Sequence, residues 1–322
     1  MIGRFHTDTT ARADVAVVIV TYNSARDLPG LLASLRPETA DLRLRVILVD
    51  NSSTDDTRAV AAAHDDVIAV AAGGNLGYAG GINVGMARVR AGEDVLVLNP
   101  DLRVTRGAVM RLHQAAHADG SIGVTAPRIL DDDGTTTDSL HHEPTVLRAF
   151  ADAALGPVWR RRPARLTEWI RDAGAYASPR DADWASGAAL LVRADVAARV
   201  GAWDERFFLY SEETDYCRRV RDAGYRIRYV PDAVVHHSQG GSGSSPALDA
   251  LLAVNRVRYA RKHAPRAAGA VRAAAILGSA LRAGRSAGHS AALRHLVRAS
   301  TWSSLPAARR DRSDTPAQPG PS

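Results

Sequence analysis

The sequence is poor in cysteine and lysine, with a single residue of each, Cys217 and Lys262, among 322. One thiol excludes an internal disulfide framework and is compatible with a reducing cytoplasm. No Cys/His spacing in the chain suits a structural zinc site. Since lysine is almost absent, arginine supplies nearly all of the positive charge.

Long apolar runs and several common nucleotide motifs are missing as well. No run approaches the roughly 18 apolar residues of a membrane-spanning helix. Residues 1–14 are polar and lack the apolar core of a signal peptide, so we expect a flexible arm there. The chain has no GxGxxG or Walker pattern and no serine nucleophile elbow, which argues against a typical dinucleotide site, a P-loop and a serine hydrolase.

The net charge of +6 is distributed unevenly. Residues 251–322 hold 13 Arg and Lys against 2 Asp and Glu, a balance of +11, which leaves −5 for residues 1–250. A basic tail on a neutral-to-acidic body indicates contact with an anionic surface, either lipid or nucleic acid.

What the chain does contain is strands alternating with helices over residues 15–126. Short apolar runs rich in β-branched residues predict strands, and apolar residues three or four apart predict helices between them. The alternation predicts an α/β fold with a doubly wound, mostly parallel sheet and helices on both faces. The predicted strands are 15–21, 45–49, 67–71, 95–98 and 122–126, and the predicted helices include 25–35, 84–90 and 106–118.

The second half is less regular. Residues 131–180 predict a long loop with short helices over the site, followed by strands at 188–193 and 225–230. Helices are predicted at 194–200 and 212–223, the latter with Ser211 as its N-cap. Beyond a glycine-serine hinge at 240–245, Ala/Leu/Arg-rich helices predict a C-terminal helical extension over 243–305, and residues 306–322 predict a disordered tail.

The stretch from Val95 to Asp101 gives the first indication of a site. Residues 95–98 suit a strand buried on both faces, and Pro100 ends it. Asp101 then lies past the C-terminal end of a central strand, at the same edge as Thr21 and Asp50, where ligands bind in open α/β sheets. A carboxylate there can hold a divalent cation and, through it, a diphosphate. The alternative is an aspartate that caps the following turn.

Three later residues are further candidates. Glu213 opens a helix beside Glu212, and a carboxylate there could remove a proton from an attacking hydroxyl. The alternative is that both are favourable first-turn acids. His236 follows the last predicted strand and could join Asp101 as a ligand, because Mn²⁺-type ions tolerate imidazole, although such a histidine is more often structural or exposed.

Taken together and in this order, these residues resemble the family 2 inverting glycosyltransferases of the GT-A fold. The resemblance covers residues 15–242, with a nucleotide-sugar half at 15–126 and an acceptor half at 183–242. Within the family, the chain is similar to bacterial rhamnosyltransferases that act on N-acetylglucosaminyl-diphospho-polyprenol. The motifs that carry it are Val-Ile-Val-Thr-Tyr-Asn (18–23), Val-Asp-Asn-Ser-Ser-Thr-Asp (49–55), Asn-Leu-Gly-Tyr-Ala-Gly-Gly-Ile-Asn (75–83), Leu-Asn-Pro-Asp (98–101), Ser-Gly-Ala-Ala-Leu-Leu-Val-Arg (186–193), Trp-Asp-Glu-Arg-Phe-Phe (203–208) and Glu-Glu-Thr-Asp (212–215).

The resemblance implies a role for each matched donor residue. Thr21, Asn23 and Asp50 are expected to contact the nucleotide, with Asp50 reading the pyrimidine ring. Asp101 is expected to bind the diphosphate and a divalent cation, Mn²⁺ or Mg²⁺, with His236 as the second metal contact. Further donor contacts are expected at Asn75, Gly77 and Asn99.

The same resemblance implies roles in the acceptor half. Trp184 and Gly187 are expected to border the acceptor, and Glu213 matches the catalytic base. The family's usual Glu-Asp pair is Glu-Glu here, so Glu212 is the alternative base.

The implied reaction is a single-displacement transfer of L-rhamnose from dTDP-rhamnose to a polyprenyl-diphosphate-linked N-acetylglucosamine or polysaccharide acceptor in cell-envelope assembly. A UDP-sugar donor, such as UDP-galactofuranose or UDP-glucose, stays open because the shape of the pocket determines which sugar is bound.

The basic extension predicts peripheral attachment to anionic lipid at the cytoplasmic face of the plasma membrane. A non-catalytic nucleic-acid-binding protein is the rival from another class. The tail offers only Tyr259 and Trp302 for base stacking, so no nucleic-acid partner is expected.

Overall fold

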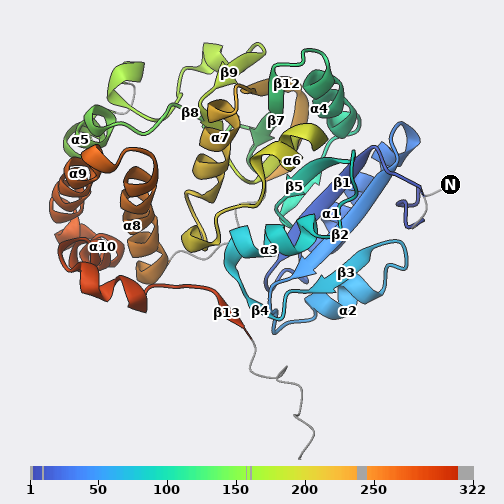
Figure 1. The fold of residues 1–322 in the computed structure, drawn as a ribbon, viewed down its shortest axis with the longest axis horizontal. Helices are drawn as coiled ribbons and strands as arrows, with labels where there is room; N and C mark the ends of the chain where they lie inside the picture. Colours follow the sequence, from blue (N-terminus) through green and yellow to red (C-terminus); the bar gives the residue numbers. More distant parts are fainter. Residues whose placement is uncertain (1–2, 9–10, 157, 160–161, 238–244, 311–322) are drawn as a thin grey trace, which may run out of the picture.

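The computed structural model describes residues 3–8, 11–156, 158–159, 162–237 and 245–310. Over these residues, a nine-stranded central sheet carries helices on both faces, and further helices gather beside it at the C-terminal end (Figure 1). Residues 240–244 of the predicted hinge at 240–245, and residues 311–322 of the predicted tail, lie outside the described residues.

The elements follow one another largely as the alternation predicts. The strands are β1 (Val15–Thr21), β2 (Leu44–Asp50), β3 (Ile68–Ala71), β4 (Gly74–Asn75), β5 (Asp94–Leu98), β6 (Leu102–Val104), β7 (Ile122–Leu130), β8 (Leu140–His141), β9 (Arg180–Ala182), β10 (Trp184–Ala185), β11 (Ala189–Val192), β12 (Arg226–His237) and β13 (Arg309–Arg310). The α-helices are α1 (Leu28–Leu35), α2 (Thr57–Ala62), α3 (Gly77–Met86), α4 (Ala108–His117), α5 (Val146–Leu155), α6 (Ala194–Val200), α7 (Glu212–Asp222), α8 (Pro246–His263), α9 (Ala268–Ala280) and α10 (Ala287–Val297).

The sheet is mixed and mostly parallel, in the order β3-β2-β1-β5-β11-β7-β12-β6, with β9 beside β12. Strands β3, β2, β1 and β5 run parallel, whereas β11 runs antiparallel between β5 and β7. The register places Thr21 opposite Asp50, so the C-terminal ends of β1 and β2 meet at one edge, as predicted. The predicted α/β architecture is therefore confirmed.

Strand β1 shows why both faces of the sheet are covered. All seven of its residues are buried. Val18 and Val20 belong to the core layer that includes α3, α6 and α7, while Val17 and Ile19 belong to the layer that includes α1, α2 and α4. Because successive strand residues point to opposite faces, an uninterrupted apolar run requires burial on both sides.

Helix α3 differs from its prediction. It was expected near 84–90, but it begins at Gly77 and ends at Met86. Glycine disfavours helices in isolation. At Gly81, however, an added Cβ would lie 2.5 Å from Cγ1 of Val20, so the missing side chain lets α3 approach the sheet closely. This packing outweighs the low helix propensity.

Strand β12 is longer than predicted. The predicted strand ends at Val230, whereas β12 continues to His237 through a register shift between Val230 and Val234. Pro231 lies within this irregularity, and proline normally indicates the end of a strand. The predicted cap of α7 also differs, because Ser211 has φ +69° and its side chain makes no capping hydrogen bond.

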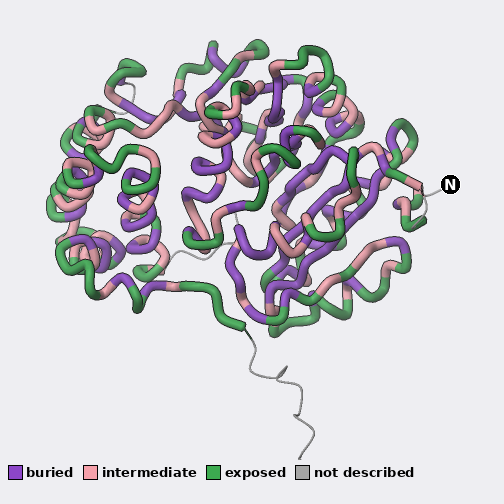
Figure 2. The backbone as a smooth tube through the Cα atoms, in the orientation of Figure 1, coloured by how far each residue is buried: buried purple, intermediate pink, exposed green. Residues whose placement is uncertain are grey.

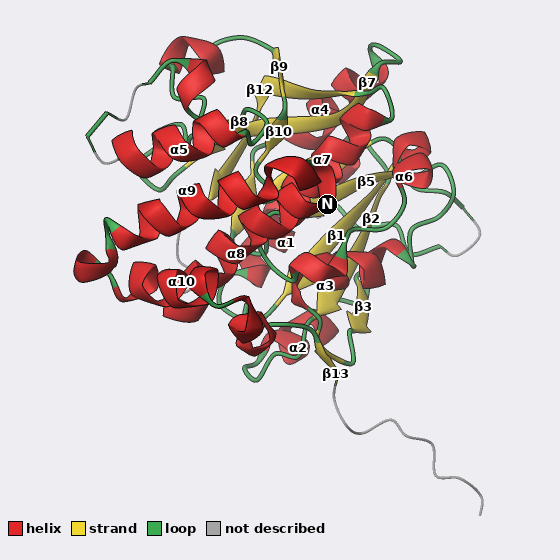
Figure 3. Ribbon diagram, turned by 60° about the vertical axis from the view of Figure 1, so that its left-hand side comes forward, coloured by secondary structure: helices red, strands yellow, loops and turns green. Residues whose placement is uncertain are grey.

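Helices α8, α9 and α10 lie with α5 to one side of the sheet (Figures 1 and 3). Leu251 and Val254 of α8 share a small core with Leu296 of α10. Beyond these helices, β13 returns to β4, where Arg309 pairs with Asn75, so this part of the stretch predicted as disordered forms a strand. Among the described residues, no helix is both long and apolar enough to cross a membrane.

Candidate active site

The first part of the site lies at the C-terminal ends of β1 and β2. Asp50 is only 7% exposed, and its Oδ1 accepts a hydrogen bond from the Ser53 amide at 3.3 Å. Thr21 is fully buried, and its hydroxyl donates to the Val49 carbonyl at 3.2 Å. The Thr21 side chain is therefore used inside the sheet and offers no surface to a nucleotide, unlike the prediction.

Asn23 connects the loops that follow these two strands. Its side-chain Oδ1 accepts from the Thr54 amide at 2.8 Å, and its own amide donates to Oγ of Ser53 at 2.9 Å. Asn23 is exposed and has φ +53°, a left-handed conformation that asparagine tolerates. It thus lies at the rim of the same edge as Asp50.

Asn51 brings two further predicted donor residues to this edge. Its Nδ2 donates to Oδ1 of Asn75 at 3.1 Å and to the Gly77 carbonyl at 3.3 Å, and its Oδ1 accepts from the Leu76 amide at 2.8 Å. Gly77 has φ +75°, and an added Cβ would collide with the Phe208 carbonyl. Asn51 was not singled out from the sequence, although an asparagine directly after a strand-ending aspartate is a recognisable signal.

Tyr78 joins the two halves of the site. Its amide donates to the Phe208 carbonyl at 2.6 Å, and its hydroxyl donates to the Gly187 carbonyl at 3.0 Å. Burial, followed by the charges of Glu212, Glu213 and Asp101, raises the pKa of Tyr78 well above its ordinary value. Tyr78 therefore lies among three of the acidic residues that the sequence nominated, although it was not itself predicted.

Asp101 faces a different histidine from the one predicted. Its Oδ1 lies 3.1 Å from Nε2 of His237, and Asp101 is 6% exposed. In the pairing of β12 with β6, His237 lies opposite Leu102, next to Asp101, whereas His236 lies opposite Arg103 and is exposed. The placement of His236 beside Asp101 was wrong, because adjacent strand residues point to opposite faces.

Asn99 extends the pairing of β5 with β11 beyond the end of β5. Its amide donates to the Ala188 carbonyl at 2.8 Å, so the chain leaving β5 lies against the start of β11. This hydrogen bond holds Asp101, two residues later, close to the acceptor motif at 186–193. The described residues of the donor and acceptor motifs therefore converge on one edge of the sheet.

Glu212 and Glu213 form a tightly coupled acidic pair at the start of α7. Glu212 is 3% exposed and Glu213 is half-buried, and one carboxylate oxygen of each is buried without a hydrogen-bond partner among the described residues. Burial and then the charge of Glu213 raise the pKa of Glu212 well above its ordinary value, and burial raises the pKa of Glu213. The pair therefore retains protons to higher pH than two separate glutamates would, and Glu213 is its more exposed member.

Gly187 borders this acidic pair, and Trp184 precedes it on β10. A Cβ added at Gly187 would lie 3.2 Å from Cβ of Glu213, so only glycine allows this spacing without movement. Trp184 stacks on His141 with ring centroids 3.7 Å apart, and its indole N–H donates to the His142 carbonyl at 3.0 Å. Burial lowers the pKa of His141 to about 3, so a neutral imidazole supports the half-buried Trp184 ring.

The ligand chemistry at Asp101 fits a hard or borderline divalent cation. A carboxylate and an imidazole are suitable ligands for an Mn²⁺-type ion, and both come from the edge where the donor residues converge.

Residues 16–173 match the family model described as glycosyl transferase family 2. Over 243 residues the chain is also 37% identical to the N-acetylglucosaminyl-diphospho-decaprenol L-rhamnosyltransferase of Mycobacterium tuberculosis, covering 72% of this chain and 78% of the relative. The chain belongs to the family 2 glycosyltransferases.

Two further comparisons extend this assignment. This chain is 30% identical over 241 residues to the galactofuranosyltransferase GlfT1 of Mycobacterium tuberculosis, and the match covers 73% of each protein. Its fold is similar to that of the mannosyltransferase PcManGT from Pyrobaculum calidifontis in complex with GDP-Man and Mn²⁺, with a TM-score of 0.52, 20% identity, and coverage of 92% and 83% of the two chains. The resemblance to GT-A glycosyltransferases seen in the sequence is confirmed.

Proposed function

We propose that this glycosyltransferase moves L-rhamnose from dTDP-rhamnose to the N-acetylglucosamine of a polyprenyl diphosphate, in cell-envelope assembly. The observation that carries the proposal is the 37% identity to a rhamnosyltransferase whose name specifies that acceptor, over more than two thirds of both chains. The geometry supports it, because Asp101, proposed to bind the diphosphate, and Glu213, proposed as the base, both lie near Tyr78.

In this account the donor lies along the edge from Asp50 to Asp101. Asp50 accepts a hydrogen bond from the pyrimidine ring, and Asn23 lies at the rim beside it. Asp101 and His237 are the residues that would hold a divalent cation, which when bound supplies charge to stabilise the departing diphosphate. Asn51 keeps Asn75 and Gly77 in place beneath the donor.

Glu213 is the residue that we assign as the base. It is less buried than Glu212, and it lies directly against Gly187 at the acceptor side. An ionised Glu213 accepts the proton of the acceptor hydroxyl as that oxygen attacks the sugar from the face opposite the leaving group, which inverts the configuration. In this account Glu212 is the more buried member of the pair and does not take the proton of the acceptor.

A galactofuranosyl donor is the second candidate, supported by the 30% identity to GlfT1. A thermal-unfolding panel of dTDP-rhamnose, UDP-galactofuranose, UDP-glucose and a GDP-sugar, each with and without Mn²⁺, separates the two. A ligand that binds only the folded state raises the midpoint by mass action. We expect the largest Mn²⁺-dependent rise with dTDP-rhamnose. A larger rise with UDP-galactofuranose would replace rhamnose with galactofuranose in the proposal.

We also propose that the C-terminal helices and α5 lie against an anionic membrane surface. Large exposed apolar side chains gather on these elements, including Leu147 (55% exposed) on α5, Leu277 (40%) on α9 and Leu281 (57%) just beyond α9. Figure 2 shows exposed surface along these helices, whereas the sheet is buried. Apolar side chains among arginines suit an interface that contains anionic lipid headgroups, where a lipid-linked acceptor resides.

Vesicle sedimentation tests this surface. Vesicles containing phosphatidylglycerol should bind the wild-type protein, and the double variant Leu277→Glu/Leu281→Glu should bind at least about tenfold more weakly, because it removes apolar contact and adds repulsion. Arg58→Glu on α2 changes the net charge equally but lies away from these helices (Figure 1). Equal loss of binding in both variants would show that overall charge, and not this surface, makes the contact.

A further inference from the structure

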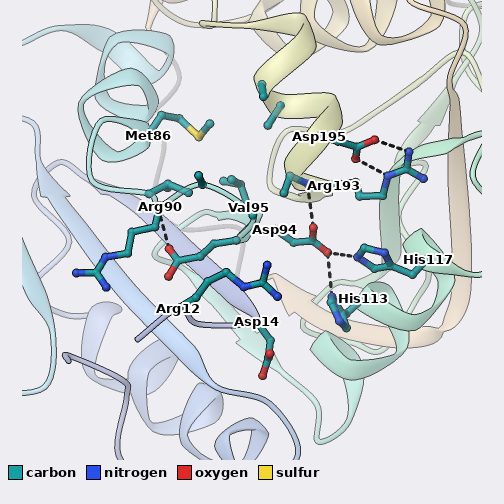
Figure 4. Close-up of a pocket in the computed structure, with 17 residues that line it drawn as sticks. Arg12, Asp14, Met86, Arg90, Asp94, Val95, His113, His117, Arg193 and Asp195 are labelled. Carbon is teal, nitrogen blue, oxygen red and sulfur yellow. Dashed lines mark hydrogen bonds and ion pairs between the residues drawn. The ribbon is translucent and has the colours of Figure 1, made fainter. Parts of the chain in front are cut away.

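Three metal-ligating side chains meet at the edge of the sheet opposite the donor site. Asp94 is the first residue of β5, and its Oδ2 lies 2.9 Å from Nδ1 of His113 and 2.7 Å from Nε2 of His117 (Figure 4). The two histidines are four residues apart on α4, so they lie one above the other on one face of the helix. We propose that Asp94, His113 and His117 bind a divalent transition-metal ion such as Zn²⁺.

The positions of the donor atoms suit such an ion. One oxygen and two imidazole nitrogens all lie within 4.8 Å of one another. A tetrahedral Zn²⁺ with bonds of roughly 2.0–2.1 Å keeps neighbouring ligand atoms roughly 3.3 Å apart. Widening the two carboxylate–imidazole contacts by about half an ångström would therefore bring them to the spacing around a tetrahedral ion.

The surrounding residues hold the carboxylate and leave room for the ion to enter. Asp94 is 2% exposed, and its second oxygen, Oδ1, accepts from the Ala194 amide at 2.9 Å, which fixes the carboxylate plane. His117 is about half exposed. All three ligands line a cavity of about 830 Å³, so a fourth ligand position opens toward solvent and not into the core. Arg193 also lines this cavity, and its Nε pairs with Oδ1 of Asp195 at 2.6 Å.

This site is separate from the one at Asp101. Asp94 begins β5 and Asp101 follows its other end, so the strand length separates them. The ligands also differ, because two imidazoles and one carboxylate favour Zn²⁺-like ions, whereas the site at Asp101 combines its carboxylate with the imidazole of His237. An ion here would tie α4 to β5 and to the start of α6, which carries Ala194. The inference does not depend on which sugar is transferred.

The competing explanation is that both imidazoles only hydrogen-bond to Asp94. Zn²⁺ binding by the full-length protein, measured by equilibrium dialysis, separates the two explanations, with Asp101→Asn used to remove binding at the donor edge. We expect wild type and Asp101→Asn to share one Zn²⁺ site that His117→Gln and His113→Gln each weaken by more than about 100-fold. Losing an outer-shell partner typically weakens metal affinity by about 10- to 100-fold, and the loss expected here is larger because each variant removes a direct ligand. His64→Gln, which removes a histidine near Arg36, is the matched control and should retain the site.

Two independent readouts complete the test. Co²⁺ bound to wild type and to Asp101→Asn should give the visible absorption of a tetrahedral ion, and His117→Gln should abolish it. Zn²⁺ should raise the thermal midpoint of wild type and His64→Gln but not that of His117→Gln. Because His117 is half exposed, this variant is expected to fold, and circular dichroism checks that it does. Equal Zn²⁺ affinity in His117→Gln and wild type, or no saturable site in Asp101→Asn, would overturn the proposal.

Discussion

Asp101 and His237 face each other where β6 and β12 pair, with Oδ1 of Asp101 3.1 Å from Nε2 of His237. The aspartate follows β5 and the histidine ends β12, so 136 residues of chain separate two side chains that share one contact. In the proposed account this contact is the cation-binding end of the donor site, and it distinguishes between two adjacent histidines.

His237→Ala should lower the transfer rate by at least about tenfold, because removing a ligand or its close partner weakens metal affinity by that order. His236→Ala is the matched control, since His236 is exposed on the other side of the same strand. Initial rates across an Mn²⁺ titration measure the effect, and excess Mn²⁺ should partly restore His237→Ala. A loss confined to His236→Ala would show that the strand register differs from the one described.

Glu213→Gln should lower kcat by about 10²- to 10⁴-fold, the usual contribution of a general base, with little change in donor KM. In the proposed account Glu212 does not take the proton of the acceptor, so Glu212→Gln should retain much more activity than Glu213→Gln. Steady-state rates for the two variants, with donor affinity measured separately, provide the comparison. A larger kcat loss in Glu212→Gln would transfer the role of base to Glu212.

The acidic pair should also lower stability as the pH rises. In the folded state the pKa of Glu212 is raised above its unfolded value of about 4.3, so between these two values the folded protein binds more protons than the unfolded chain. The free energy of unfolding should therefore fall as pH rises above about 4.3, with a limiting slope of about 1.4 kcal/mol per pH unit for one proton.

Glu212→Gln should remove much of this slope and become more stable than wild type at neutral pH. Urea unfolding at pH 5, 6 and 7 gives the difference between the two proteins at each pH. A difference that does not grow with pH would mean that Glu212 titrates at its ordinary pKa. Since the same variant is also assayed for transfer, stability and activity can be compared directly.

The start of α7, which carries the acidic pair, is fastened to α8 by the only lysine of the chain. Nζ of Lys262 lies 2.6 Å from Oδ1 of the fully buried Asp215 and 2.7 Å from Oδ2 of Asp204. Lys262→Met should lower the free energy of unfolding by about 1–3 kcal/mol, because Asp215 loses a charged partner while His263 and Arg219 remain.

Arg266→Met is the control for that experiment, since Arg266 is exposed just beyond α8 and its loss should change stability by no more than about 0.5 kcal/mol. Chemical denaturation of both variants measures the comparison. Equal effects would mean that the C-terminal helices do not support α7. A loss of activity in Lys262→Met that follows its loss of stability would be consistent with α7 being held in place from the C-terminal side.

The edge of the sheet that carries the candidate site was predictable, because parallel strands buried on both faces have uninterrupted apolar sequences. Those runs fixed the ends of β1, β2 and β5, and hence the shared edge of Asp50 and Asp101. Helix α3 was misplaced because its glycines are selected by close packing on β1, and packing is not visible in helix propensity.

The choice between the two histidines could not be made from the sequence. Alternation in β12 assigns one histidine to each face, but the register shift after Val230 breaks the count from the earlier, clearly buried residues. Asn51 and Tyr78 were contained in the recognised motifs, yet their functions as connectors depend on contacts with Asn75 and Gly187, which are distant in sequence. The cluster of Asp94 with His113 and His117 was likewise invisible until β5 and α4 were placed together.

The transfer reaction itself tests the central claim most directly. Purified protein is incubated with Mn²⁺, N-acetylglucosaminyl-diphospho-polyprenol and either dTDP-rhamnose or UDP-galactofuranose. The molecular mass of the lipid product is then measured by mass spectrometry. We predict a mass increase of one deoxyhexose with dTDP-rhamnose, release of dTDP, and loss of both signals in Glu213→Gln. Addition of a hexose from UDP-galactofuranose, with none from dTDP-rhamnose, would contradict the proposed donor, and no product from either would contradict the proposed reaction.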